Sequence, residues 1–306
     1  MPDDQTRVWT IRELMKSAIE HLQGKGFEEA RLNVELLLAH ALDLQRIQLY
    51  VNFDKPLTPE ELKQFRTLYE RRLTREPVQY IIGSANFMGL HFTVDPRVLI
   101  PRPETETLIE QAMLACQRYP ADEPIHILEV GTGSGNIAVS IAKYVKHAQI
   151  TTIDISLEAL AVAKQNAWLH SVESQIKFSC SDIFDQSDEL FQIQYDLLVS
   201  NPPYVPKDEW EQLQKEVRDF EPSSALTDGK DGFKFYHHMA GIIPTILKPG
   251  GGVVFEVGFS QAEIVARELK KAGLVELQIT NDLQGIPRVV SGMWMSSQKN
   301  TFIGLN

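Results

Sequence analysis

The chain has 306 residues, of which 43% are hydrophobic, so it can bury one large core and one smaller core, and an intrinsically disordered protein is excluded. Its two cysteines fit a reducing compartment and exclude a cysteine-rich zinc site. No stretch approaches 18 consecutive apolar residues, so we expect a soluble, cytoplasmic protein without a membrane-spanning helix. The net charge of −11 comes entirely from residues 76–306, because residues 1–75 carry 12 basic and 12 acidic side chains. A region this acidic is a poor binder of nucleic acid backbones.

Residues 1–78 are predicted to form a small helical bundle. Thr10–Glu13 and Thr58–Glu61 both have the Thr-x-x-Glu spacing of a capping box, and residues 28–42 carry apolar side chains at helical spacing. We interpret the basic run Arg71–Arg75 as a solvated helix face. The stretch has no glycine-rich loop, histidine pair or catalytic constellation, which favours a packing or partner-docking domain.

After Pro77 the pattern changes to short β-like pieces, and residues 79–100 are predicted to be a linker that contains a β-hairpin around Gly89. Strands and helices then alternate, with strands predicted over residues 125–130, 149–155, 176–180, 195–200, 252–257, 275–280 and 289–294. Alternation at this spacing predicts an α/β domain over residues 101–306, in which a mainly parallel sheet is covered by helices on both faces.

A glycine turn joins the first of these strands to its helix. Its G-x-G-x-G spacing differs from the G-x-G-x-x-G dinucleotide fingerprint, which would require a glycine where Asn136 stands. The variant, with Glu129 two positions before the first glycine, is typical of S-adenosylmethionine binding, where no pyrophosphate has to be held. The predicted fold is therefore a Rossmann-like class I S-adenosylmethionine-dependent methyltransferase sheet with a small N-terminal helical bundle, and the predicted cofactor is S-adenosyl-L-methionine, with S-adenosyl-L-homocysteine as product.

Two further acids stand at the ends of the next two strands. Asp154 follows Gly131 by 23 residues, where a carboxylate can accept two ribose hydroxyls, and Asp182 can accept the adenine amino group while Ile183 or Phe184 covers the ring. Each acid alone is more often a strand-end cap than a ligand, but their shared position at consecutive strand ends favours one cofactor site. The predicted cofactor-binding residues are Glu129, Gly131, Thr132, Gly133, Ser134, Gly135, Asp154, Ile155, Asp182, Ile183 and Asn201.

The segment Asn201-Pro202-Pro203-Tyr204 follows a fourth buried strand and is suited to hold a planar NH2 group. A Pro-Pro pair has two fixed φ angles and no backbone N–H, so the Asn201 side-chain oxygen and the Pro202 main-chain carbonyl can be posed rigidly as two acceptors. Tyr204 offers a flat face to a conjugated group. A surface turn is the simpler interpretation of the tetrapeptide, but its position at a strand end favours catalysis.

With these residues assembled, the chain resembles the release-factor glutamine methyltransferases of the HemK type over nearly its whole length. The most specific matches are residues 79–83, residues 98–106, the glycine turn and the Asn-Pro-Pro-Tyr segment, with further matches at residues 220–222, 228–232, 256–258 and 282–288. The resemblance implies that the chain methylates the glutamine of the Gly-Gly-Gln motif in class-one peptide chain release factors, which residues 1–78 would dock. It also implies catalytic roles for Asn201, Pro202 and Tyr204, and substrate contacts from Asn201, Pro202, Pro203, Tyr204, Arg102 and Pro103.

Two other functions fit parts of the pattern. The same slot could seat an exocyclic amino group of a nucleic acid base, although a nucleic-acid amino methyltransferase would be expected to have a basic groove, which the acidic balance of residues 76–306 does not favour. An inactive cofactor-binding scaffold is the other alternative, and the complete glycine turn and Asn-Pro-Pro-Tyr segment argue against it. We further expect a monomer with no metal, no membrane partner and no stable nucleic acid partner.

Overall fold

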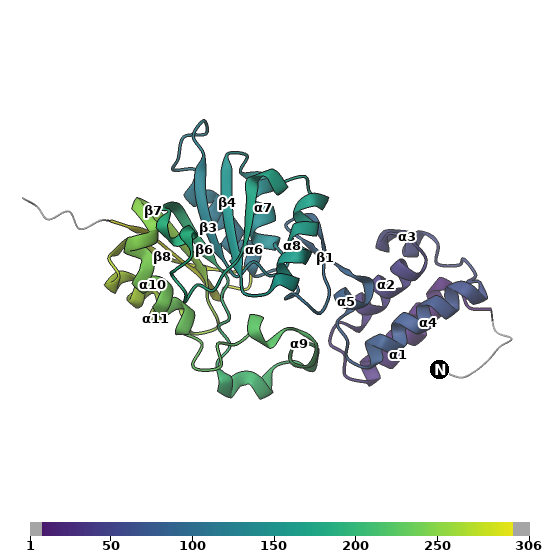
Figure 1. The fold of residues 1–306 in the computed structure, drawn as a ribbon. Helices are drawn as coiled ribbons and strands as arrows, with labels where there is room; N and C mark the ends of the chain where they lie inside the picture. Colours follow the sequence, from purple (N-terminus) through teal and green to yellow (C-terminus); the bar gives the residue numbers. More distant parts are fainter. Residues whose placement is uncertain (1–7, 296–306) are drawn as a thin grey trace, which may run out of the picture. The chain divides into compact units, whose positions relative to one another are not determined.

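The structure, a computed structural model, describes residues 8–295 in two compact units (Figure 1). The first contains the described residues up to Ser84 together with Gln214–Phe220, and the second contains Ala85–Leu213 and the described residues from Glu221 onward. The first unit therefore includes a segment that is distant from it in sequence. The predicted limits at residues 78 and 100 are not the limits of these two units.

The first unit is a helical bundle with its own hydrophobic core. Its helices are α1 (Ile11–Gly24), α2 (Ala30–Ala41), α3 (Arg46–Val51), α4 (Pro59–Leu73), α5 (Val78–Ile82) and α9 (Lys215–Phe220). Both predicted capping boxes are confirmed, because the Thr10 and Thr58 hydroxyls accept from the backbone N–H of Glu13 and Glu61. Leu14, Leu37 and Phe65 are fully buried in the core that these helices share. Burial of such side chains stabilises a bundle of short helices that would be marginal alone.

The predicted start of the hairpin linker at residue 79 is wrong. Val78–Ile82 forms helix α5, which follows Pro77 and ends at Gly83, where φ is +75° and the chain needs a residue without a Cβ atom. Val78 and Ile81 are buried in the core of the bundle. The hairpin itself is present as β1 (Ser84–Phe87) and β2 (Leu90–Thr93), with Gly89 at positive φ between them.

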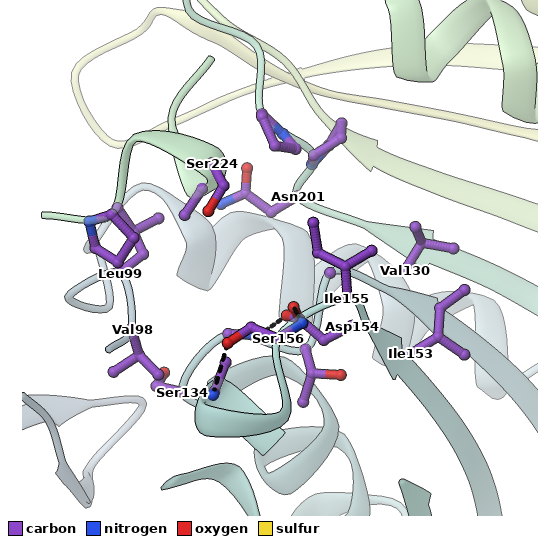
Figure 2. A pocket seen from close by; sticks show the side chains of 18 of the residues that line it. Val98, Leu99, Val130, Ser134, Ile153, Asp154, Ile155, Ser156, Asn201 and Ser224 are labelled. Atoms are coloured by element: carbon purple, nitrogen blue, oxygen red, sulfur yellow. Dashed lines mark hydrogen bonds between the residues drawn. The ribbon is translucent and has the colours of Figure 1, made fainter. Parts of the chain in front are cut away.

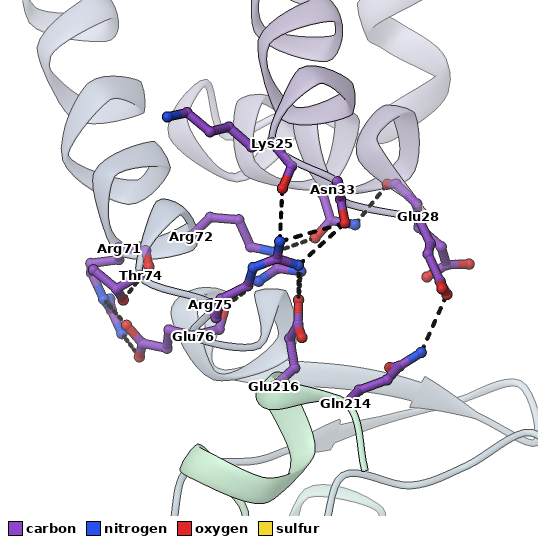
Figure 3. A network of polar contacts seen from close by, with 12 residues as sticks. Lys25, Glu28, Asn33, Arg71, Arg72, Thr74, Arg75, Glu76, Gln214 and Glu216 are labelled. Carbon is purple, nitrogen blue, oxygen red and sulfur yellow. Dashed lines mark hydrogen bonds and ion pairs between the residues drawn. The ribbon is translucent and has the colours of Figure 1, made fainter. Parts of the chain in front are cut away.

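The interpretation of Arg71–Arg75 as a solvated face is also wrong for Arg72, which is 6% exposed (Figure 3). Its guanidinium pairs with Glu216 of α9 at 2.9 Å, donates to Asn33 at 2.5 Å and lies 4.4 Å from the ring centroid of Phe27. Arg75 also contacts Glu216, at 3.2 Å. A residue 144 positions away supplies the buried charge with its partner, so local sequence could not reveal the pairing.

The second unit is built on a seven-stranded sheet in the order β5-β4-β3-β6-β7-β9-β8. Its strands are β3 (Ile125–Val130), β4 (Ala148–Asp154), β5 (Ile176–Cys180), β6 (Tyr195–Ser200), β7 (Leu247–Glu256), β8 (Leu274–Asn281) and β9 (Pro287–Trp294). The first five in this order are parallel, and β9 is antiparallel to both of its neighbours. The predicted mainly parallel sheet is confirmed. Its strand order reverses between β3 and β6, where the carboxyl ends of parallel strands leave a crevice.

Helices cover both faces of this sheet (Figure 1). On one face lie α6 (Thr105–Cys116), α7 (Asn136–Tyr144) and α8 (Leu157–Leu169), and on the other lie α10 (Lys234–Ile246) and α11 (Ala262–Lys271). All six residues of β6 are buried, as expected for a central parallel strand. Short 3-10 helices lie at Glu173–Gln175, Glu189–Gln192, Lys207–Gln212 and Ser223–Ala225. Within residues 8–295, no helix is long and apolar enough to cross a membrane.

Candidate active site

A cavity of about 410 Å³ opens at the carboxyl ends of β3, β4, β5 and β6 in the second unit (Figure 2). Its walls come from the glycine turn, the ends of the next two strands, the Asn-Pro-Pro-Tyr segment, and two loops at residues 96–102 and 222–225. Asp154 and Ser134 lie on one side of it, and Asn201 and Ser224 on the other. The cavity is in the size range of small-molecule and cofactor sites. Most of the predicted site residues therefore converge on one place.

The glycine turn, residues 131–135, leaves open space beside its backbone at one end and allows close packing of two helices at the other. Gly131 and Gly133 line the cavity at φ values of +88° and +52°, and a Cβ atom on Gly133 would meet no protein atom within 4 Å. The open space beside this backbone is what close approach of a ligand requires. Gly135, predicted as a cofactor contact, does not line the cavity, because a Cβ atom there would lie 2.9 Å from that of Ala163. The direct contact predicted for Gly135 is thus corrected to close packing of α7 against α8.

Asp154 is held with both carboxylate oxygens oriented by the backbone. The N–H of Gly133 donates to one oxygen at 2.9 Å, and the N–H of Ser156 donates to the other at 2.9 Å. Each oxygen retains acceptor capacity toward the cavity, since a carboxylate has about four acceptor positions. Asp154 thereby connects the end of β4 to the glycine turn, and its placement fits a ligand with a pair of hydroxyls.

Asp182 and its neighbours form a second, partly apolar part of the cavity wall. Asp182 accepts from the N–H of Phe184 at 3.0 Å, and Ile183 is buried. Phe184 packs against Phe235 with ring centroids 5.2 Å apart, and both rings line the cavity. On the β4 side, Ile155 lines the cavity and is 64% exposed. Carboxylates next to apolar side chains fit a nucleoside, which has a polar ribose and a flat base.

Glu129, predicted as a cofactor contact, is fully buried and lies outside the cavity wall. Neither of its carboxylate oxygens has a hydrogen-bond partner within ordinary distance among the described residues. Burial raises its pKa to about 8, because the charged form loses its hydration. A direct contact between Glu129 and the cofactor therefore finds no support in the cavity wall, because this side chain is fully buried behind it.

We expect Glu129→Gln to stabilise the protein at alkaline pH and to leave cofactor affinity within about threefold. A carboxyl whose folded pKa is raised contributes stability that is complete below its unfolded pKa of about 4.5 and is lost as pH rises toward 8. The amide of the variant does not titrate, so its melting temperature should fall less between pH 5 and pH 9. Thermal melts across this range, with calorimetric titration of cofactor, measure both quantities. A variant with the wild-type pH dependence, or with cofactor affinity lost, would contradict this assignment.

Asn201 is anchored through its neighbours at the end of β6. The Ser200 hydroxyl donates to the carbonyl of Val130 at 2.8 Å, which fixes the strand end against β3. The side-chain NH2 of Asn201 donates to the Thr105 hydroxyl oxygen at 3.3 Å. This bond uses one of the two N–H groups of the amide, so the side-chain oxygen is the end of the amide that does not face Thr105. Pro202 and Pro203 also line the cavity.

Tyr204 makes its contacts with the core side of the segment. It is absent from the cavity wall, and its hydroxyl donates to the buried carboxylate of Glu256 at 3.3 Å. Burial raises the pKa of Tyr204 well above its ordinary range. Its main-chain carbonyl accepts from the Gln261 side chain at 2.9 Å, and a Cβ atom on Gly232 would lie 2.2 Å from that carbonyl. These contacts anchor the segment against the core, and the role of Tyr204 as a slot face stays a prediction.

Of the two substrate contacts predicted outside the Asn-Pro-Pro-Tyr segment, Arg102 lines the cavity and Pro103 does not. Arg102 lines the cavity and pairs with the buried Glu221, which also accepts from the N–H of Ile100 at 3.1 Å. Pro103 is exposed and lies outside the cavity wall, because the chain turns there toward α6. Arg102 and Glu221 therefore join the two loops that flank the cavity, whereas Pro103 does not belong to its wall.

Several wall residues were not predicted as site residues. Thr105, Ser156, Ser224 and Phe235 all line the cavity. Thr105 and Phe235 fall within or next to predicted helices. Threonine and phenylalanine are common in protein cores, so the sequence gives no reason to assign these two positions to a site. Within residues 8–295, no group of three or more histidine, cysteine, aspartate or glutamate side chains could hold a metal ion.

Comparison with known proteins shows which proteins this chain is similar to. Residues 13–83 match the family described as PrmC N-terminal domain, and residues 111–218 match the methyltransferase small domain. A release factor glutamine methyltransferase of Geobacter sulfurreducens is 43% identical over 94% of this chain and 98% of its own length. A protein of the same name from Chlorobaculum tepidum is 43% identical over 96% of this chain and 99% of its own, and one from Koribacter versatilis is 38% identical over 92% and 98%.

Proposed function

The chain belongs to the release factor glutamine methyltransferases, and we propose that it uses S-adenosyl-L-methionine to methylate the side-chain amide nitrogen of the glutamine in the Gly-Gly-Gln motif of class-one peptide chain release factors. One structural observation supports the proposal most directly. Asn201 lines the same cavity as Asp154 and the glycine turn, and its NH2 donates to Thr105, so its side-chain oxygen would be the group available to a substrate amide.

The cavity residues fit the cofactor. Asp154 would accept the ribose hydroxyls, Asp182 would accept the adenine amino group, and the backbone of Gly131 and Gly133 would allow the ligand close approach. Ile155 and Phe184 supply apolar surface for the base. When bound, S-adenosyl-L-methionine supplies a methyl group activated by its sulfonium. The wall carries both acidic and basic side chains, which suits a ligand that has an ammonium, a sulfonium and a carboxylate group.

The residues of the Asn-Pro-Pro-Tyr segment would act by orientation. An amide nitrogen is a poor nucleophile, because its lone pair is delocalised into the carbonyl, so accurate positioning has to supply much of the rate. The Asn201 oxygen and the Pro202 carbonyl would accept the two N–H groups of the glutamine amide. These hydrogen bonds strengthen as positive charge develops on nitrogen, which lowers the barrier. Among the described residues that line the cavity there is no histidine, so the proton would leave to water.

The helical unit would dock the release factor, and the acidic balance of residues 76–306 disfavours the nucleic-acid alternative. The test is to incubate the protein with labelled S-adenosyl-L-methionine and a release factor, and to measure the Gly-Gly-Gln peptide by mass spectrometry. We expect one methyl group on the glutamine and none in a factor whose glutamine is replaced. Label in RNA or DNA alone would overturn the proposal.

A further inference from the structure

Beneath Asn201 lies a buried acid that the proposed chemistry does not use directly. Glu256 is the last residue of β7 and is 1% exposed. Ser200 of β6 is paired in register with Phe255 of β7, so the next residues along the two parallel strands, Asn201 and Glu256, lie side by side. Thr105, the first residue of α6, is equally buried and contacts Asn201. Three residues from distant parts of the sequence thus meet at one strand end.

The hydrogen-bond capacities of these groups complement one another. The Thr105 oxygen accepts from the Asn201 NH2 at 3.3 Å, so the Thr105 hydroxyl proton is available to donate elsewhere. One oxygen of Glu256 accepts from Tyr204 at 3.3 Å, and the other has no hydrogen bond of ordinary length among the described residues, although the Thr105 hydroxyl lies near enough to lower the pKa of this carboxyl. An acceptor buried without a partner costs free energy, because it has lost its hydration. A nearby hydroxyl with a proton to donate would remove that cost.

We propose that Thr105 and Glu256 form a relay that positions the Asn201 amide, with the Thr105 hydroxyl donating to Glu256 and accepting from the Asn201 NH2, so that the Asn201 oxygen faces the cavity. The proposal rests on the proposed function for its substrate. Thr105 and Glu256 are positioning residues, because neither needs to touch the substrate. Without them the Asn201 amide could rotate by about 180° and present a donor where the substrate requires an acceptor.

The relay would also strengthen Asn201 as an acceptor. When an amide donates from its nitrogen, electron density moves toward its oxygen, and successive hydrogen bonds polarise one another in a low-dielectric interior. The surroundings of Glu256 are consistent with this role. Burial raises its pKa to about 7, while the Thr105 hydroxyl, the Arg288 guanidinium and the Tyr204 hydroxyl oppose that rise by favouring the carboxylate.

The decisive variant is Thr105→Val, which keeps the branched shape and removes the hydroxyl. We expect kcat to fall about tenfold, as for loss of one hydrogen bond, while KM for the release factor and the cofactor dissociation constant stay within about twofold. Thr105→Ser restores the hydroxyl and should recover most of kcat. Thr107→Val is the matched control, because it removes a second buried hydroxyl from the same turn of α6, outside the cavity wall. Glu256→Gln should retain more activity than Glu256→Leu.

A second readout is independent of turnover. In ¹⁵N–¹H spectra, the side-chain NH2 signal of Asn201, identified by its loss in Asn201→Asp, should show slow hydrogen exchange in the wild type and in Thr105→Ser. It should exchange faster in Thr105→Val. Wild-type kcat together with an unchanged Asn201 signal in Thr105→Val would overturn the relay. If the wild type methylated no release factor while the signal still depended on Thr105, the proposed function would fail and the relay would stand.

Discussion

Replacement of Asn201 by alanine is expected to lower kcat by about 10²–10³-fold, the cost of removing one preorganised group that stabilises developing charge. The side-chain oxygen accepts one of the two amide N–H groups in the proposed complex, so its loss removes both an orienting contact and an interaction that strengthens in the transition state. Turnover should be measured at saturating release factor and cofactor. The cofactor dissociation constant should change by less than about threefold, because Asn201 occupies the opposite side of the cavity from Asp154.

Asn201→Asp is the informative companion of this variant. It keeps an oxygen at the required position but cannot donate to Thr105, so we expect turnover between those of the wild type and Asn201→Ala. Melting temperatures of both variants show whether the strand end stays folded. Wild-type kcat in Asn201→Ala, or more activity in the alanine variant than in the aspartate variant, would refute the acceptor role.

Replacement of Asp154 by alanine is expected to weaken cofactor binding by at least about a hundredfold. Two hydrogen bonds from ribose hydroxyls to a charged acceptor contribute roughly 1.5–3 kcal/mol each. The variant also releases the N–H groups of Gly133 and Ser156 from the carboxylate, so the glycine turn loses its connection to β4. Calorimetric titration with S-adenosyl-L-methionine and with S-adenosyl-L-homocysteine measures the loss, and kcat at saturating cofactor should change far less than affinity.

Asp185→Ala supplies a matched control for the local backbone contact. Asp185 accepts from the N–H of Ser187 two residues later, as Asp154 does from Ser156, but it lies outside the cavity wall. We expect its replacement to leave cofactor affinity within about twofold. Equal affinities of the wild type and Asp154→Ala would exclude Asp154 from the cofactor site. Together, Asp154→Ala and Asn201→Ala separate loss of affinity from loss of turnover, which the proposal assigns to opposite walls of the cavity.

Much of the cavity could be predicted because its signals are local or follow from a general rule. Asp154, Asp182 and Asn201 each lie at or just beyond the end of a parallel strand, and the carboxyl ends of such strands meet at one edge of a sheet. The glycine turn is recognisable by its spacing, since only glycine tolerates its backbone angles without cost. These features need no knowledge of which side chains pack together.

Three of the predicted residues that lie outside the cavity wall share one feature. Glu129, Gly135 and Tyr204 stand beside true wall residues in sequence, yet the structure directs them to the core, to α8 and to Glu256 respectively. Successive residues of a strand point to opposite faces, and a turn points its residues in several directions, so neighbours in sequence need not share a cavity. Burial of Arg72 likewise depends on Glu216, which no local pattern connects to it.

The sequence by itself determined the alternation of strands and helices after residue 125, the mainly parallel sheet, the glycine turn and the Asn-Pro-Pro-Tyr segment at a strand end, because these depend on near neighbours and on hydrophobic period. Only the tertiary structure decided which polar groups face the cavity and which are buried behind it. Thr105 and Glu256 reach Asn201 from a helix start and an adjacent strand, and such a meeting is set by the packing of elements far apart in the chain.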